Sequence, residues 1–512
     1  MSRPVPHLQW TGGAVSSDLI AGVSVALILV PQALAYAVIA GVPPYVGLLA
    51  AGLPTIAAAP FASSRYLQTG PVAMTALLTF GALSVIATPF TSRYIALAAL
   101  LALIVGVIRI GIGLTNLGFV AHFMSKPVMV GFTIGATTLI SASQLPTLLG
   151  VERGDSGLLV EAWRSITSPA DWSTGAIVFG FGTIAVILVS RLLGPRFPGV
   201  LITIVVATIV SAAIDFEGQV VGDIPTGLPG LSLDLPWGDI ASLLIPGLVI
   251  ALVGFTEAAA IASAFAAEDR EKWDPSREFV AQGAANIASG LAGGFPVGGS
   301  FARSSLNKLA GARSRWSGAF TGLAVLASVP LAGLLEGLPS AVLAAIVITA
   351  AARLIKPREV ARIWRRSRLQ AGVAVVTLVA TIGLSPRIDI AVLVGIALAV
   401  AVHLGRELRL DVEVRIREDV LEIEPNGVIY FASTPQLTNL LIDKLAEHPD
   451  LEHLVIDMSG VGRIDFTGGN ALSTVITDAQ AAGLDVEIVG VPDHARRIVN
   501  GVLRDLELSQ AD

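Results

Sequence analysis

Residues 293–305 have the sequence Gly-Gly-Phe-Pro-Val-Gly-Gly-Ser-Phe-Ala-Arg-Ser-Ser and place glycines, a proline and Arg303 in an otherwise apolar region. In a membrane, an unwound backbone of this kind is tolerated only where protein or a water-filled cavity covers its N–H and C=O groups. If a short helix begins near Ser300, its first amides carry partial positive charge, and Arg303 adds a full one. We therefore expect an anion site formed by Ser300, Phe301, Ala302 and Arg303.

Glu257 is the only ionisable residue between positions 245 and 265. A carboxylate at the depth of such an apolar segment costs several kcal/mol, so it must face protein or water. One interpretation is a structural pair with Arg303; another is proton coupling, because a carboxyl group in a low-dielectric site accepts a proton at modest cost. We favour a combination, in which Glu257 and an anion compete for Arg303, so that a proton and an anion travel together.

Three further groups of residues could complete the site. Gln32 and Tyr36 lie four residues apart, on one helix face, and could donate hydrogen bonds to an oxyanion; the alternative for Tyr36 is packing between helices. Residues 70–73, which are Gly70, Pro71, Val72 and Ala73, would begin a second half-helix whose amides face those near Ser300. The hydroxyls of Thr69, Ser300 and Ser304 could contribute, or could bond back to helix carbonyls.

The elements that position these residues are membrane helices. The chain has 512 residues, of which 54% are hydrophobic and 14% charged, a composition typical of a polytopic α-helical membrane protein. Residues 1–13 lack the pattern of a signal peptide, so the first apolar segment is expected to remain in the membrane. We expect about fourteen transmembrane segments, at residues 18–39, 46–60, 70–87, 94–113, 127–148, 174–193, 200–214, 240–266, 279–292, 300–309, 317–334, 340–354, 369–384 and 388–404.

We expect two repeats of seven segments, residues 18–214 and 240–405, because proline and glycine interruptions recur at corresponding positions in both. Lysine and arginine concentrate in alternate loops, which places residues 1–17 and the carboxyl terminus in the cytoplasm. The absence of cysteine excludes disulfides and thiolate-bound metals. No enzyme, nucleotide-binding or metal motif occurs, so we expect no enzyme activity, cofactor, metal or nucleic-acid partner, and energy from an ion gradient.

Residues 411–512 have the interspersed charges of a soluble domain. Residues 412–416 alternate as a strand, and residues 428–431, 454–457 and 486–489 are further predicted strands. Helical periodicity in residues 437–447, 469–482 and 494–503 completes a small α/β domain.

At these residues the chain resembles the sulfate permease (SulP) family of anion transporters. Pro31-Gln-Ala-Leu-Ala-Tyr-Ala37, Thr69-Gly-Pro-Val-Ala73 and Gly294-Phe-Pro-Val-Gly-Gly-Ser-Phe-Ala-Arg303 are similar to its first-, third- and tenth-span motifs. The resemblance implies fourteen spans in two inverted repeats and a core domain that slides against a gate domain. It also implies a homodimer and an anion site between the third and tenth half-helices. The chain departs from the family pattern at Ala302, where the family often has serine. The anion would then be held by fewer side-chain hydroxyls and by more backbone amides.

The carboxyl-terminal domain resembles a STAS domain, through Asp457-Met-Ser-Gly460 and Ile464-Asp-Phe-Thr-Gly468. The resemblance makes Thr467 a candidate phosphorylation site, and it also implies a cytoplasmic protein partner that binds through the STAS domain. The alternative is that Thr467 caps the helix that follows.

The leading hypothesis is a secondary active transporter of small anions (sulfate, bicarbonate or dicarboxylate) in a bacterial inner membrane, working by proton-coupled symport with an elevator-like alternating-access mechanism. Four alternatives remain open at this point. They are a sodium-coupled bicarbonate symporter, an uncoupled anion exchanger, a nucleobase transporter and a membrane-anchored anion-sensing signalling platform.

Overall fold

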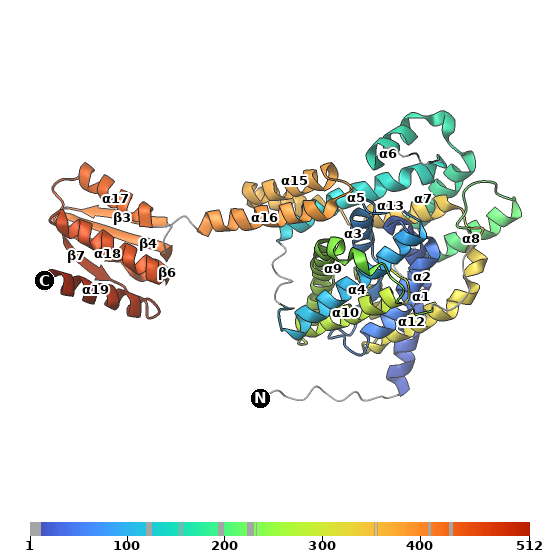
Figure 1. Cartoon of the computed structure of the whole chain (residues 1–512), viewed down its shortest axis with the longest axis horizontal. Helices are drawn as coiled ribbons and strands as arrows, with labels where there is room; N and C mark the ends of the chain where they lie inside the picture. The colour runs from blue at the N-terminus through green and yellow to red at the C-terminus, as the bar shows by residue number, and fades with distance from the viewer. Residues whose placement is uncertain are drawn as a thin grey trace. The chain divides into compact units, whose positions relative to one another are not determined.

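The computed structural model describes residues 12–118, 125–152, 154, 157–192, 199–222, 230–231, 233–352, 354–355, 357–407, 411–429 and 434–511. The chain forms two compact units, Met1–Ala397 and Leu398–Asp512, each with a hydrophobic core of its own (Figure 1). Most of the expected cytoplasmic amino-terminal segment, residues 1–11, lies outside the described residues, and the first helix already begins at Gly12.

The first unit is helical, as its apolar segments predict. Its helices are α1 (Gly12–Ala40), α2 (Pro44–Ala58), α3 (Ala73–Leu83), α4 (Ser92–Leu114), α5 (Lys126–Leu149), α6 (Leu158–Thr167), α7 (Thr174–Leu192), α8 (Gly199–Ala213), α9 (Ile240–Glu268), α10 (Pro275–Leu291), α11 (Phe301–Leu309), α12 (Trp316–Ser328), α13 (Ser340–Ala352), α14 (Pro357–Arg366) and α15 (Arg368–Gly383), and α16 (Ile388–Glu407) begins in this unit and continues past Ala397 into the second. Each of the fourteen expected segments coincides with one helix, and α6 and α14 are additional. Within the described residues, seven helical stretches are long and apolar enough to cross a membrane.

The packing of these helices shows the two repeats. α4 packs against α9 and α10, and its counterpart α12 packs against α1 and α2. In the same way α5 packs against α15, while its counterpart α13 packs against α7. Exchanging the repeats therefore leaves this pattern of neighbours unchanged, which is the arrangement that inverted repeats produce.

Two groups of helices result. α1–α4 pack with α9–α12 as a core group, and α5–α8 pack with α13–α15 as a gate group, the two meeting chiefly where α1 touches α8 and α13. Small residues allow the closest approach in the core group: a Cβ on Gly283 of α10 would lie 2.9 Å from the carbonyl oxygen of Gly106 on α4. Helices in lipid associate through such close packing at small residues.

The second unit is an α/β domain. Its strands are β3 (Asp411–Arg417), β4 (Val420–Ile429), β5 (His453–Asp457), β6 (Val461–Ile464) and β7 (Asp485–Val489), and its helices are α17 (Thr434–Glu447), α18 (Phe466–Ala481) and α19 (Arg496–Ala511). The strand order is β3-β4-β5-β7, and β6 pairs with β4; β3 is antiparallel to β4 and the other pairs are parallel. Residues 428–429 of the predicted strand 428–431 form the end of the longer β4, while residues 430–431 lie outside the described residues, and β6 was not expected.

Candidate functional site

The two broken segments meet as a pair of short strands. β1 (Thr69–Gly70) runs antiparallel to β2 (Gly298–Gly299), with Thr69 opposite Gly299 and Gly70 opposite Gly298. α3 begins at Ala73 and α11 at Phe301, close behind these strands, and neither N-cap residue, Val72 or Ser300, caps its helix with a side chain. Two helix N-termini without side-chain caps therefore lie on either side of one pair of strands, and both favour negative charge.

Arg303, in the first turn of α11, is 1% exposed. Its Nη1 donates to the carbonyl oxygen of Pro71 at 2.9 Å and to Oε1 of Gln32 at 3.4 Å. Its Nε and Nη2 are buried and have no hydrogen-bond partner among the described residues. Because a buried charged donor without a partner is costly, these N–H groups are suited to an anionic ligand.

Gly70 explains how the guanidinium fits against the broken strand. A Cβ on Gly70 would lie 3.4 Å from Nη2 of Arg303, and its φ of +156° belongs to a region that L residues rarely adopt. Pro71, Val72 and Ala73 are buried beside it, with the Pro71 carbonyl serving as the main anchor of Arg303. The structure thus brings together Gln32, residues 70–73 and Arg303.

Glu257 lies half-buried on α9 next to the same strands. The neighbouring Ala258 packs so tightly on β2 that a Cβ on Gly299 would lie 2.9 Å from its own. Glu257 and the buried Tyr36 both act electrostatically on the Arg303 guanidinium. The carboxyl group is therefore placed to influence what Arg303 binds.

The remaining predicted residues have other contacts. The Ser300 amide donates to the carbonyl of Gln68, and Phe301 stacks on Phe265 of α9 at 6.4 Å between ring centroids. Ala302 is exposed. The hydroxyl of Ser304 accepts from the Gln68 amide instead of bonding back to its own helix.

Arg109 on α4 is a second fully buried arginine that the sequence reasoning missed. Its Nε, Nη1 and Nη2 donate to the carbonyls of Ala251, Val297 and Ile250, at 3.1, 2.9 and 3.2 Å. Every nitrogen of this guanidinium is therefore used to tie α4 to α9 and to the segment before β2. The signal was available, since Arg109 is an ionisable residue inside a predicted membrane segment.

α10 supports the broken segment with three polar residues on one face, which were also missed. Asn286 accepts from the Val297 amide at 3.0 Å and donates to the Val297 carbonyl at 3.1 Å, so it pairs with this residue as a neighbouring strand would. Gln282 donates to the hydroxyl of Thr69 at 2.6 Å, and Ser289 donates to the carbonyl of Phe295 at 2.7 Å. Their helical spacing in the sequence was the signal.

In the second unit, Thr467 is exposed in the first turn of α18. The N-cap of this helix is Asp465, whose Oδ1 accepts from the Gly468 amide at 2.7 Å, so the interpretation of Thr467 as the cap is wrong. Exposure is compatible with modification of Thr467, which stays a prediction.

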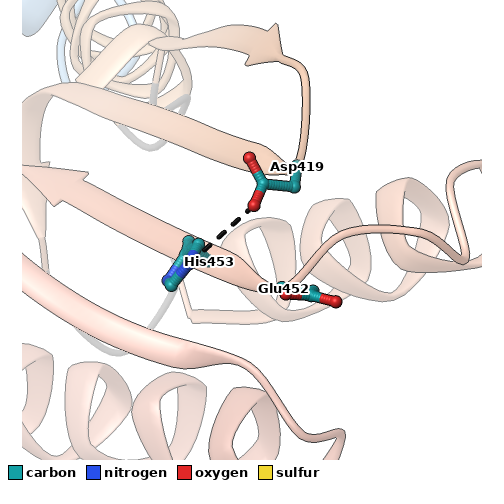
Figure 2. Close-up of side chains that lie close together, drawn as sticks. All are labelled: Asp419, Glu452 and His453. Atoms are coloured by element: carbon teal, nitrogen blue, oxygen red, sulfur yellow. Dashed lines mark ion pairs between the residues drawn. The ribbon is translucent and has the colours of Figure 1, made fainter.

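One group of possible metal ligands occurs among the described residues, Asp419, Glu452 and His453, at the starts of β4 and β5 (Figure 2). These side chains lie near the surface, where Nε2 of His453 lies 3.9 Å from Oδ2 of Asp419 and its Nδ1 lies 3.7 Å from Oδ2 of Asp485. Nothing else there points to a metal.

Comparison with known proteins bears on both units. Residues 15–377 match the model of the sulfate permease family, and residues 411–509 match that of the STAS domain. A protein named as a probable sulfate transporter of Mycobacterium tuberculosis is 37% identical over 383 residues, covering 73% of this chain and 67% of the relative.

Two solved structures share the fold. The murine anion transporter Solute Carrier 26 family member A9 superposes with a TM-score of 0.85 at 20% identity, over 98% of this chain and 88% of that one. The transmembrane domain of the cyanobacterial bicarbonate transporter BicA gives a TM-score of 0.64 at 24% identity, over 77% of this chain and 98% of that one. Because the family model matches residues 15–377 and the relative is 37% identical over 73% of this chain, the chain belongs to the sulfate permease family of anion transporters, with a STAS domain at residues 411–509.

Proposed function

We propose that the chain is a secondary active transporter in which a small anion binds between the amino ends of α3 and α11. The observation that carries this is the difference between Arg303 and Arg109. Both are buried, but Arg109 uses every nitrogen in protein contacts, while Nε and Nη2 of Arg303 have no hydrogen-bond partner in the part of the chain that the structure describes. An oxyanion would pair with these two donors in the bidentate geometry that guanidinium groups favour.

We propose that Glu257 couples the anion to a proton. Ionised, Glu257 offsets part of the positive potential of Arg303, and this weakens the hold of the site on an anion. Protonation removes that negative charge, so the anion and the proton bind together. Sliding of the core group against the gate group, an elevator-like motion, would carry both across the membrane.

Sulfate and bicarbonate are the first substrates to test. The relative from Mycobacterium tuberculosis is named for sulfate and the cyanobacterial structure for bicarbonate, and small dicarboxylates share their oxyanion chemistry. One arginine and two helix ends do not select among them.

The deciding experiment is uptake of these labelled anions into proteoliposomes under an imposed pH or sodium gradient. We expect uptake driven by a proton gradient in the wild type, none in Arg303→Ala, and gradient-independent exchange only in Glu257→Gln. Lys308→Ala is the matched control, because this cation of α11 pairs with Asp269 and Glu268 instead of the site.

Different results would replace the proposal. Uptake by Arg303→Ala at the wild-type rate would defeat the assignment of the site. Sodium-driven uptake that ignores the pH gradient would replace the proton with sodium. Uracil or xanthine uptake without inhibition by anions would indicate a nucleobase transporter, and no uptake of any solute would favour a sensing role.

We also propose a homodimer in a bacterial inner membrane with both termini in the cytoplasm and a protein partner for the STAS domain. The orientation is inferred from the charge of the loops. Basic residues such as Lys126, Arg270 and Arg313 lie at helix ends that face the cytoplasm in this orientation.

A further inference from the structure

Among the described residues, α14 packs mainly against α15 and the start of α5. Glu359 pairs with Lys126 at the start of α5 at 3.6 Å, and Ile363, four residues further on, is half-buried. No residue of α14 is buried, although the helix lies between two membrane segments. Most of the surface of α14 is therefore not covered by the described residues of the protein.

One exposed face of α14 is an apolar stripe. Val360 and Trp364, four residues apart and thus on one face, are 38% and 61% exposed. They border an open cavity of about 450 Å³, whose lining consists of Ile355, Pro357, Val360, Ala361, Trp364 and Arg365. A tryptophan exposed beside a membrane helix is typical of the boundary between lipid and water.

The face opposite the apolar stripe is basic. Arg358, Arg362 and Arg366 follow one another at intervals of four residues, Arg365 lies at the edge of the cavity, and all four are exposed. Glu359, the one acidic residue of the helix, is turned toward Lys126. The exposed side chains of α14 thus combine an apolar stripe with four positive charges on the rest of the helix surface.

α6 occupies the same place in the first repeat and provides an internal comparison. It also exposes an apolar stripe, with Leu159, Val160, Trp163 and Ile166, of which Trp163 is 67% exposed. Its charged residues are Glu161 and Arg164, which cancel. The apolar stripe therefore recurs in both repeats, while the arginine face belongs to α14 alone.

We propose that α14 is an interfacial helix that binds anionic phospholipids, with Val360 and Trp364 inserted among the acyl chains and the four arginines holding lipid phosphates. Amphipathic helices with basic polar faces bind to membrane surfaces in this way, and their affinity depends on anionic headgroups. The charge favours lipid over a second copy of the chain, because four clustered arginines would have to face an acidic surface in any protein partner.

The test uses the full-length protein in nanodiscs and takes advantage of its lack of cysteine. A fluorophore is attached at position 361 through Ala361→Cys, in the cavity lining, or at position 160 of α6 through Val160→Cys. Its quenching by phosphatidylglycerol with brominated acyl chains is compared with quenching by equally brominated phosphatidylcholine, at the same mole fraction.

We expect phosphatidylglycerol to be enriched at position 361 roughly fivefold, the preference that about one basic side chain contributes at an anionic surface. The enrichment should disappear in the combined variant Arg358→Gln, Arg362→Gln, Arg365→Gln, Arg366→Gln, and should be absent at position 160. It should also fall with added salt in the single-cysteine protein itself, a readout that needs no change to the arginines.

Equal quenching by the two lipids at position 361 would overturn the headgroup preference. Protection of position 361 from both lipids would overturn the proposal as a whole, because it would mean that protein covers the stripe.

Discussion

Arg109 and Arg303 are both large cations buried among membrane helices, where an uncompensated charge is expensive. For Arg109 the compensation is three backbone carbonyls, and Gly254 makes room for it, since a Cβ there would lie 2.6 Å from its Nη2. For Arg303 the compensation shown by the described residues is partial. A stabilising role and a ligand-binding role can therefore be separated by experiment.

The first prediction concerns stability. Arg109→Met should lower the free energy of unfolding by at least about 2 kcal/mol, because it removes three charge-assisted hydrogen bonds between α4, α9 and the segment before β2. Arg303→Met should leave the ligand-free protein much closer to the wild type but abolish its thermal stabilisation by the transported anion. Thermal unfolding in detergent, with and without anion, measures both. An Arg109→Met protein that melts at the wild-type temperature would contradict this assignment.

The second prediction concerns Gln32, whose Oε1 accepts from Arg303. Gln32→Glu should weaken anion uptake, raising the half-saturating anion concentration by roughly tenfold or more, because a carboxylate at 3–4 Å from a guanidinium competes with the anion. Gln32→Leu removes the acceptor without adding charge and should be milder. Uptake measured against anion concentration distinguishes the two variants, and equal effects would show that charge is not the cause.

At the scale of elements, the antiparallel pairing of β1 with β2 depends on glycines that allow the strand and helix backbones to approach closely. Gly299→Ala should destabilise the protein by about 1–3 kcal/mol and reduce uptake, since its Cβ would lie 2.9 Å from Ala258 and Leu67 and would push β2 away from α9. Gly318→Ala in α12 is the control, because its nearest neighbour would be 3.8 Å away. Equal effects of the two substitutions on uptake would contradict the proposed role of Gly299 in the pairing of β1 with β2.

The membrane helices could be predicted because hydrophobicity and length determine them locally. α6 and α14 could not be found in this way, because they are amphipathic helices of 10 residues each, shorter than a membrane span requires. The pairing of Gly70 with Gly298 could be proposed from the position of the breaks, but its register depends on Asn286, Arg109 and other partners far away in the sequence. That Nε and Nη2 of Arg303 lack a hydrogen-bond partner among the described residues is a result of packing, which no sequence pattern reveals.

At the scale of the molecule, the two units solve different folding problems. Membrane helices satisfy their backbone groups internally and associate by close packing in lipid. The second unit buries an apolar core in water, built from β4, β5 and β6 together with α17–α19. Since this core involves only residues beyond 411, the domain contains its own driving force for folding.

Residues 411–512, expressed alone, should therefore fold cooperatively, with a free energy of unfolding of roughly 5 kcal/mol, as is usual for about a hundred residues. Ile456, 1% exposed on the interior strand β5, lies opposite Ile423 and Ile488, and Ile456→Ala should cost about 2–5 kcal/mol. Ile442, 56% exposed on α17, offers the same substitution outside the core, where Ile442→Ala should change stability by less than about 0.5 kcal/mol. Urea unfolding followed by circular dichroism measures all three proteins. A fragment without cooperative unfolding would mean that the domain depends on the membrane unit, because its own core would then be insufficient to offset the entropy of folding.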